Sequence, residues 1–142
     1  MDNAILVLTT VVSICQREDC FPCKTQAGKC TRQGAVYLMT CERCQREGRE
    51  AYYVGETART PYDRGQEHLS AMRKGNKESP MVEHEEEYHG GLDPEFTMEW
   101  ISNSKSNIQR QVGEYHQMLK YGEKGILLNR RGEWGQNLPP PL

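Results

Sequence analysis

Apolar residues in this chain occur in short runs that are separated by charged, glycine-rich or proline-rich stretches. Runs rich in β-branched and aromatic residues predict strands. Such runs occur at residues 4–15, 35–40, 51–55, 96–101 and 126–128. The second and third runs follow each other closely, so we expect them to pair as a hairpin across the charged loop 41–50.

Three helices are expected between and after these strands. Thr60-Pro61 and Ser79-Pro80 each place a hydroxyl N-cap before a proline at the first helical position. Ser106 caps a third helix, which the glycines at 122 and 125 are expected to end. The predicted helices cover residues 61–74, 80–88 and 107–119.

The order of these elements, a strand and a hairpin followed by mixed helices and strands, predicts the fold class α+β. A length of 142 residues is that of one domain. We divide it into an N-terminal strand and cysteine-rich segment at 1–33, a core at 34–131 and an irregular tail at 132–142. Hydrophobic residues make up 36% of the chain, so the core is thin and a bound metal would help to hold it together.

Charge is distributed unevenly along the chain, although the net charge is only −2. Residues 20–49 hold six basic against two acidic residues, and residues 77–99 hold one lysine against eight acids. This arrangement suits an anionic partner that touches one side of the domain. Two differently charged solvated faces explain it equally well.

Six cysteines lie in the N-terminal part of the chain: Cys15, Cys20, Cys23, Cys30, Cys41 and Cys44. A disulfide framework would require a secreted protein. The apolar run 4–15 has no basic region before it and no clear cleavage site, and it is too short to span a bilayer. We therefore expect a reducing, intracellular compartment, in which such cysteines usually bind metal.

Two pairs of cysteines have the spacing of a structural zinc site. Cys20-x-x-Cys23 and Cys41-x-x-Cys44 are separated by seventeen residues. Cys30 competes with them for the four places around a tetrahedral Zn²⁺, and the spacing alone does not decide which four bind. The N-terminal segment is thus a predicted zinc knuckle, with about one Zn²⁺ per chain.

Other potential metal ligands receive different interpretations. Cys15 lies in an apolar run and is interpreted as a buried hydrophobic residue. His84 and His89 flank three consecutive glutamates, and we interpret this stretch as a solvated acidic helix end. The spacing of these histidines does not support a second metal site.

Several polar residues near strand ends and on helices carry potential chemistry. Arg64 and His68 are spaced i, i+4 and therefore share one face of a helix. Tyr37 and Tyr53 lie near the ends of strands, and Glu114 lies within the last predicted helix. Each of them taken alone is more simply explained as a core or surface residue.

Taken together, the set resembles the GIY-YIG nuclease family. Residues 35–37 (Ala-Val-Tyr) and 53–55 (Tyr-Val-Gly) correspond to its two tyrosine motifs, the first with Ala and Val in place of Gly and Ile. The resemblance covers about residues 34–131 and implies the GIY-YIG nuclease fold, a small antiparallel β-sheet flanked by helices. A helical arginine, a glutamate on a later helix and a final asparagine follow in the family's order, here Arg64, Glu114 and Asn129.

The detailed sequence is most similar to the endonuclease domains of Penelope-like retroelements. Residues 53–59 (Tyr-Val-Gly-Glu-Thr-Ala-Arg) resemble that subgroup, and so does a Cys-x-x-Cys unit between the two tyrosine motifs. The resemblance favours Cys30, Cys41 and Cys44 as zinc ligands, whereas the spacing favours the two Cys-x-x-Cys pairs.

This resemblance implies a metal-dependent DNA endonuclease that uses one Mg²⁺ or Mn²⁺. Hydrolysis of a phosphodiester needs an activated water, a neutralised phosphate and a stabilised leaving oxygen. Glu114 is the expected cation ligand, and Arg64 is the expected donor to the phosphate. The other residues are expected to assist with water, phosphate or geometry: Tyr37 or Tyr53 holds or deprotonates the water, His68 orients water or phosphate, and Asn129 fixes the geometry.

Three functions are compatible with these residues. The first is an endonuclease that nicks target DNA for a mobile element in a nucleus, with DNA and a reverse transcriptase domain of the same element as partners and no membrane. The second is a zinc-stabilised nucleic-acid-binding module without activity. The third is a repair or recombination nuclease of the same family. The combination of tyrosine, arginine, glutamate and asparagine favours an enzyme.

Overall fold

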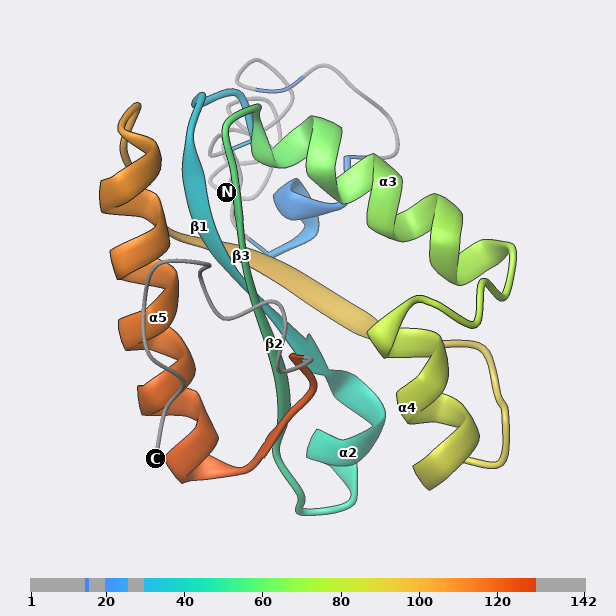
Figure 1. Cartoon of the computed structure of the whole chain (residues 1–142). Helices are drawn as coiled ribbons and strands as arrows, with labels where there is room; N and C mark the ends of the chain where they lie inside the picture. Colours follow the sequence, from blue (N-terminus) through green and yellow to red (C-terminus); the bar gives the residue numbers. More distant parts are fainter. Residues whose placement is uncertain (1–14, 16–19, 26–29, 130–142) are drawn as a thin grey trace, which may run out of the picture.

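A computed structural model of the protein describes residues 15, 20–25 and 30–129 (Figure 1). The strand expected at 4–15 lies outside this part of the chain except for Cys15, and the tail at 132–142 lies outside it entirely. The elements in chain order are η1 (Pro22–Lys24, a short 3₁₀ turn), β1 (Ala35–Cys41), α2 (Glu42–Arg46), β2 (Ala51–Thr57), α3 (Pro61–Arg73), α4 (Pro80–Tyr88), β3 (Phe96–Asn103), α5 (Asn107–Lys124) and β4 (Ile126–Leu127).

The four strands form one sheet in the order β3-β1-β2-β4. β1 pairs antiparallel with both β2 and β3, which confirms the expected hairpin. β4 pairs parallel with β2, so the sheet is mixed and the expectation of a purely antiparallel sheet is wrong. Because α5 carries the chain back along the sheet after β3, β4 starts from the same end as β3 and must run parallel to it.

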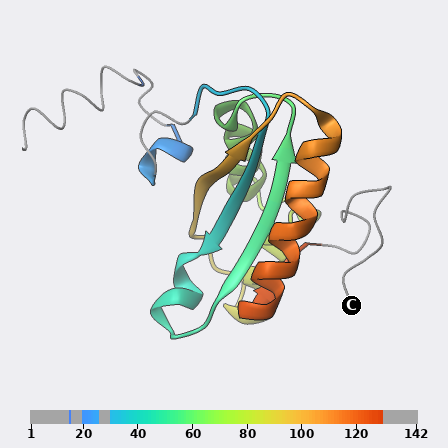
Figure 2. The same ribbon diagram turned by 90° about the vertical axis from the view of Figure 1, so that its left-hand side faces the viewer.

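The sheet is covered on both faces (Figures 1 and 2). On one face, Tyr37 and Met39 of β1 belong to a core cluster with residues of η1, α3 and α4. On the other face, Val36 and Leu38 pack with Met118 of α5. A strand that is buried on both faces is apolar at successive positions. This explains why β1 reads as an uninterrupted apolar run, and the class α+β is confirmed.

The helices begin at the predicted caps. The side chain of Thr60 accepts a hydrogen bond from the backbone N–H of Asp63 at 3.2 Å, and Ser106 does the same for Gln109 at 3.2 Å. Each cap satisfies one of the N–H groups that a helix start leaves without an internal partner. Helix α4 also begins where predicted, with Pro80 as its first residue, but Ser79 makes no side-chain cap hydrogen bond.

Helix α5 continues beyond its predicted end. It passes through Gly122 and reaches Lys124. A glycine inside a helix costs about 1 kcal/mol relative to alanine. Tyr121 packs against Tyr52 of β2 with ring centroids 4.8 Å apart. Burial of these rings offsets that cost, because packing contributes more than propensity in a helix that lies against a sheet.

Candidate active site and metal centres

Tyr37 lies at the centre of the candidate active site. Its ring, on β1, is fully buried. The phenolic oxygen lies 2.8 Å from Nε2 of His68 and accepts a hydrogen bond from Nε of Arg64 at 3.1 Å. Because Arg64 and His68 are one turn apart on α3, the helix presents both side chains to the same tyrosine. The i, i+4 spacing of Arg64 and His68 in the sequence therefore corresponds to contacts of both side chains with the Tyr37 hydroxyl.

Tyr53 completes a cluster of three rings. Its ring centroid lies 6.5 Å from that of Tyr37 and 5.6 Å from that of His68. The Tyr37 and His68 rings meet edge to face, with centroids 5.6 Å apart. These separations are typical of stabilising aromatic contacts. The two tyrosine motifs thus face α3 together.

Gly55 lies directly opposite Tyr37 in the hairpin. A Cβ atom on Gly55 would lie 2.3 Å from both Cζ and the hydroxyl oxygen of Tyr37, which is far inside van der Waals contact. The tyrosine ring therefore occupies the space that a side chain at position 55 would need. This gives a steric reason for glycine in the second tyrosine motif.

Replacing Gly55 with alanine is expected to destabilise the protein by about 1–3 kcal/mol, because the new methyl group displaces the Tyr37 ring from its partners. Urea unfolding followed by circular dichroism measures the change. Gly122→Ala is a matched control, since its Cβ would meet Leu127 at an ordinary 3.8 Å and alanine favours a helix. A Gly55→Ala protein as stable as wild type would contradict the close packing of Tyr37 over this position.

Burial keeps the Tyr37–His68 pair neutral. Burial raises the pKa of Tyr37, with a further increase from nearby Tyr53 and Glu114, although the Arg64 guanidinium opposes these effects. Burial, assisted by the positive charge of Arg64, lowers the pKa of His68 to about 3. Arg64 donates to the Tyr37 oxygen. The Tyr37 hydroxyl can therefore donate its own proton to Nε2 of His68, which accepts when the imidazole is neutral and protonated on Nδ1.

The pKa of His68 predicts how stability depends on pH. Its value of about 3 lies below the ordinary 6.5. Between these values the unfolded chain binds a proton that the folded protein excludes, so His68 costs stability as pH falls from about 6.5 toward 3. From pH 7 to 4.5, we expect wild type to lose about 2 kcal/mol more than a His68→Gln variant.

Urea unfolding at both pH values measures this difference. His116→Gln serves as a control, because His116 is an exposed histidine on α5. It should lose as much stability on acidification as wild type. Equal losses in wild type and His68→Gln would show that His68 is not held neutral by the fold.

Glu114 and Asn129 come from the C-terminal part of the fold and contribute in different ways. Glu114 lies on α5 and is buried, with its carboxylate close enough to Tyr37 to contribute to the raised pKa of that tyrosine. Asn129 follows β4, accepts a hydrogen bond from the N–H of Val54 at 2.9 Å and donates one to its carbonyl at 2.6 Å. The structure thus brings Tyr37, Tyr53, Arg64 and His68 together on one face of the sheet. Glu114 comes from α5, which covers the other face, and its charge acts on Tyr37. Asn129 holds the β2 backbone between Tyr53 and Gly55.

Two charged residues to which the sequence assigned no role form ion pairs on the helices that carry Arg64 and Glu114. Glu67 accepts a hydrogen bond from Nη1 of Arg64 at 3.0 Å and also forms an ion pair with Arg59. Arg110 is buried, with Nε 2.9 Å from a Glu56 carboxylate oxygen and Nη1 2.8 Å from a backbone carbonyl. Arg110 lies one turn before Glu114, and this i, i+4 spacing was the available signal.

The first group of metal-ligand residues is Cys41, Cys44, His84 and His89, all buried, with ligand atoms within 4.8 Å of one another. Sγ of Cys44 lies 3.3 Å from Nε2 of each histidine, and Sγ of Cys41 lies 3.6 Å from Nε2 of His89. Ligands at the usual zinc–sulfur and zinc–nitrogen distances form a tetrahedron with edges of about 3.6 Å. This cysteine–histidine cluster could therefore hold a zinc ion.

Local structure assembles the cysteine–histidine cluster. Residues 41–50, expected as a loop, include the short helix α2, and Sγ of Cys41 accepts a hydrogen bond from the N–H of Cys44 at 3.4 Å. His84 lies on α4 and His89 directly follows it. Burial raises the pKa of Cys41 to about 12 and lowers that of His84 to about 4. The interpretation of His84 and His89 as a solvated acidic helix end is therefore wrong.

The second group is Cys15, Cys20, Cys23 and Cys30, whose sulfur atoms also lie within 4.8 Å of one another. Burial raises the pKa of Cys20 to about 11 and also raises that of Cys30. A set of four sulfur ligands suits a structural zinc ion. Cys15, interpreted from the sequence as a buried hydrophobic residue, is half-buried and belongs to this four-cysteine cluster.

A strand explains why the two Cys-x-x-Cys pairs are not in one site. Cys30 precedes β1, whereas Cys41 is its last residue. The seven residues of β1 rise about 3.3 Å each, so the strand keeps its two ends about 20 Å apart. The five predicted cysteine ligands are therefore divided between two clusters, and the expectation of a single site is wrong.

The acidic and basic segments meet at one corner of the molecule. The Glu95 carboxylate pairs with Nη2 of Arg43 at 3.2 Å and with Nη2 of Arg46 at 2.6 Å. Nε of Arg43 also lies 3.6 Å from the buried Glu85 carboxylate. Two of the cations expected to meet an anionic partner are thus paired within the protein. The separate charged faces inferred from the sequence are wrong at this corner.

Comparison with known proteins identifies no relative. The chain matches no family model, and no curated protein or solved structure is significantly similar to it. The family resemblance therefore depends on the residues of this chain alone. In the part of the chain that the structure describes, no helix has the length and hydrophobicity needed to cross a membrane.

Proposed function

We propose that this protein is a metal-dependent endonuclease of the GIY-YIG type that hydrolyses phosphodiester bonds in DNA. The observation that carries the proposal is the contact of Tyr37 with Arg64 and His68, beside Tyr53 and near Glu114. These side chains come from β1, β2, α3 and α5. Unrelated core and surface residues would have no reason to meet in this combination.

Arg64 is suited to bind the phosphate. Its Nε donates to Tyr37 and its Nη1 to Glu67, which fixes the plane of the guanidinium. The side chain is 33% exposed, so the remaining N–H groups are accessible to a ligand. A planar guanidinium held in this way matches the geometry of phosphate oxygens. Arg64 would therefore neutralise charge that develops on the phosphate.

Tyr37 and His68 are suited to handle the proton of the attacking water. The Tyr37 oxygen accepts from Arg64 and directs its own proton at His68, so one lone pair remains for a water molecule. The Tyr37 side chain has no exposed surface, so this water would have to enter beside the partly exposed Arg64. A proton taken from that water by Tyr37 can be matched by transfer of the phenolic proton to Nε2 of His68. Both groups rest neutral, so Tyr37 carries a proton to give and Nε2 of His68 is free to accept it. Because the pKa of His68 is about 3, the transfer would need a bound cation to make the water more acidic.

Glu114 is suited to hold the divalent cation. Its buried carboxylate is a hard oxygen ligand of the kind that Mg²⁺ and Mn²⁺ prefer, and its charge is close enough to raise the pKa of Tyr37. A cation bound there would stabilise negative charge on the phosphate and on the leaving oxygen. Asn129 supports the site indirectly, since it fixes the β2 backbone next to Tyr53.

The resemblance to Penelope-like endonucleases extends the proposal to a biological setting. In that setting the enzyme nicks target DNA for a mobile element, in a nucleus, and cooperates with a reverse transcriptase domain of the same element. A nicking assay tests the enzymatic proposal first. Supercoiled plasmid is incubated with the zinc-loaded protein and Mg²⁺, and conversion to the relaxed circle is followed on a gel. DNA binding without cleavage would favour a zinc-stabilised binding module.

Replacing Arg64 with alanine is expected to slow cleavage by about 10²–10³-fold, because a preorganised donor to the transition state is lost. Single-turnover nicking rates measure the effect. Arg73→Ala is the matched control, since Arg73 is an exposed arginine at the other end of α3 and should retain the wild-type rate. Equal rates for Arg64→Ala and wild type would remove Arg64 from the site.

A further inference from the structure

The four-cysteine cluster (Cys15, Cys20, Cys23 and Cys30) is connected to the start of α3. The carbonyl of Cys30 accepts a hydrogen bond from the N–H of Tyr62 at 3.1 Å. Tyr62 is the second residue of α3, and the first N–H groups of a helix have no partner within it. A residue of the cysteine cluster thus supplies an acceptor to the helix that carries Arg64.

A second contact lies one residue beyond Arg64. A Cβ atom on Gly65 would lie 3.1 Å from Cδ of Pro22 and 3.3 Å from Sδ of Met98. Pro22 is fully buried and lies between Cys20 and Cys23. The helix therefore rests on Pro22 at this point. The two contacts with the cysteine segment fall on either side of Arg64.

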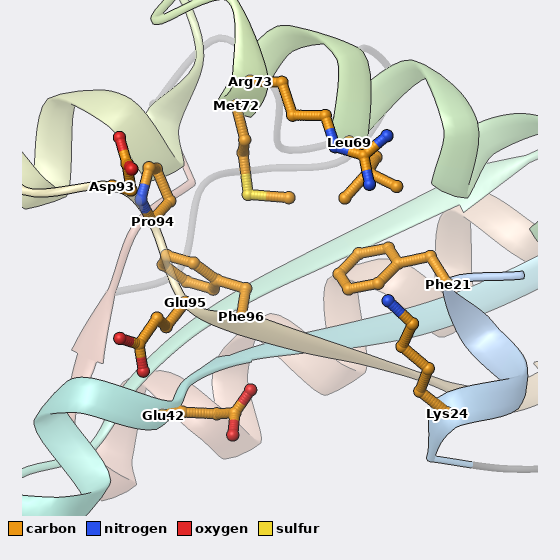
Figure 3. A pocket seen from close by; sticks show the side chains of 10 residues that line it. All are labelled: Phe21, Lys24, Glu42, Leu69, Met72, Arg73, Asp93, Pro94, Glu95 and Phe96. Carbon is orange, nitrogen blue, oxygen red and sulfur yellow. The ribbon is translucent and has the colours of Figure 1, made fainter. Parts of the chain in front are cut away.

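Phe21 extends the contact along α3. It is 5% exposed and belongs to the same core cluster as Tyr37 and Met72. In Figure 3 its ring reaches from η1 toward Leu69 and Phe96, where it forms one wall of a cavity of about 370 Å³. The ring thus fills one end of the space between α3 and the sheet. Movement of η1 would open this space under the helix.

Secondary structure alone holds η1 weakly. Its backbone forms two single-turn hydrogen bonds, from the N–H of Lys24 to the carbonyl of Phe21 at 3.3 Å and from the N–H of Thr25 to that of Pro22 at 3.2 Å. One turn of this kind does not compensate the entropy of ordering its residues. The four sulfur atoms surround this segment in sequence and converge in space. A metal ion that joins them would supply the missing cross-link.

We propose that the four-cysteine cluster binds a zinc ion of its own and that this ion clamps Phe21, Pro22 and the Cys30 carbonyl against α3. The clamp sets the position of Arg64 and His68, and this last step rests on the proposed nuclease function. The cysteine–histidine cluster, in contrast, joins α2 to α4 and stabilises the other end of the molecule. Phe21 and Pro22 act as positioning residues and not as catalytic ones.

Two sets of measurements on the full chain test the clamp. Metal analysis of protein purified without chelators should find about two zinc ions per chain, and about one in Cys23→Ser. Hydrogen exchange then follows the Tyr62 amide, which donates to Cys30, with the middle of α5 as an internal control. We expect exchange at Tyr62 to rise by about tenfold or more in Cys23→Ser, while α5 stays protected.

A second variant separates the clamp from the metal. Phe21→Ala should retain two zinc ions and still expose the first turn of α3, whereas Phe21→Leu should largely restore protection. In a nicking assay Phe21→Ala should lower kcat with DNA affinity unchanged, because α3 is displaced but not unfolded.

Three results would overturn the inference: one zinc ion in wild type, disulfides among these four cysteines, or unchanged exchange at Tyr62 in both variants. A protein with two zinc ions and the expected exchange pattern that does not cleave DNA would support the clamp and contradict the nuclease proposal alone.

Discussion

Replacing Glu114 with glutamine is expected to abolish Mg²⁺-dependent nicking while DNA binding survives. The substitution preserves the volume of a buried side chain but removes the charge that would hold the cation. A cation contributes several kcal/mol to stabilising charge in the transition state, so the rate should fall by about 10³-fold or more. Single-turnover nicking measures the rate, and fluorescence anisotropy with a labelled duplex measures binding.

The matched control for this prediction lies on the same helix. Glu123 is an exposed glutamate near the C-terminal end of α5, and Glu123→Gln should cleave at the wild-type rate. Circular dichroism and thermal melting of both variants guard against an effect on folding. A folded Glu114→Gln protein that nicks DNA as fast as wild type would end the assignment of Glu114 as the cation ligand.

Loss of the cysteine–histidine cluster is expected to have the largest effect on stability. His84→Ala removes one of four buried ligands and leaves two buried sulfur atoms and a histidine without a full coordination shell. Because zinc binding is coupled to folding, we expect a loss of at least about 4 kcal/mol, or about 13 °C in Tm. Differential scanning calorimetry of zinc-loaded protein measures this change.

His116→Ala provides the comparison for the zinc prediction. His116 is exposed on α5, so its removal should leave both the zinc content and Tm close to wild type. Metal analysis of the same samples shows whether the change in Tm follows the amount of bound zinc. A His84→Ala protein that melts with the wild-type Tm would mean that the cysteine–histidine cluster does not stabilise the fold.

The elements of the sheet were predictable where local patterns and packing agree. β1 and β2 are buried on both faces, so their apolar runs marked them clearly. The N-cap at Thr60 located the start of α3 because the cap itself makes the bond. The direction of β4 was not predictable from its own residues. It depends on α5 returning the chain along the sheet, which is a property of the whole fold.

The candidate site was predictable in part. The spacing of Arg64 and His68 anticipated that both face one point, and Tyr37 occupies that point. The role of Asn129 is local to the β2 backbone, which no spacing in the sequence reveals. The motif that this chain resembles has glycine at the position of Gly55, and the steric reason, the Tyr37 ring across that position, emerged only from the register of the hairpin.

The metal centres were the least predictable feature. Two Cys-x-x-Cys pairs suggested one site, but β1 intervenes and holds their ends apart. The partners of Cys41 and Cys44 are histidines that lie forty residues or more away, on and after α4. The fold places α4 and the residue after it beside Cys44, with Sγ 3.3 Å from Nε2 of both His84 and His89. Sequence spacing identifies ligands only where no regular element separates them.

The measurement that tests the central proposal most directly is nicking of a supercoiled plasmid by the zinc-loaded wild-type chain, with and without added Mg²⁺. In the control reaction Mg²⁺ is simply left out. A chelator is not used, because it would also remove zinc from the two metal centres. The proposed site predicts relaxation of the plasmid only when Mg²⁺ or Mn²⁺ is present, and none with Glu114→Gln. A folded, zinc-loaded wild-type protein that binds DNA but leaves the plasmid supercoiled in Mg²⁺ and in Mn²⁺ would contradict it.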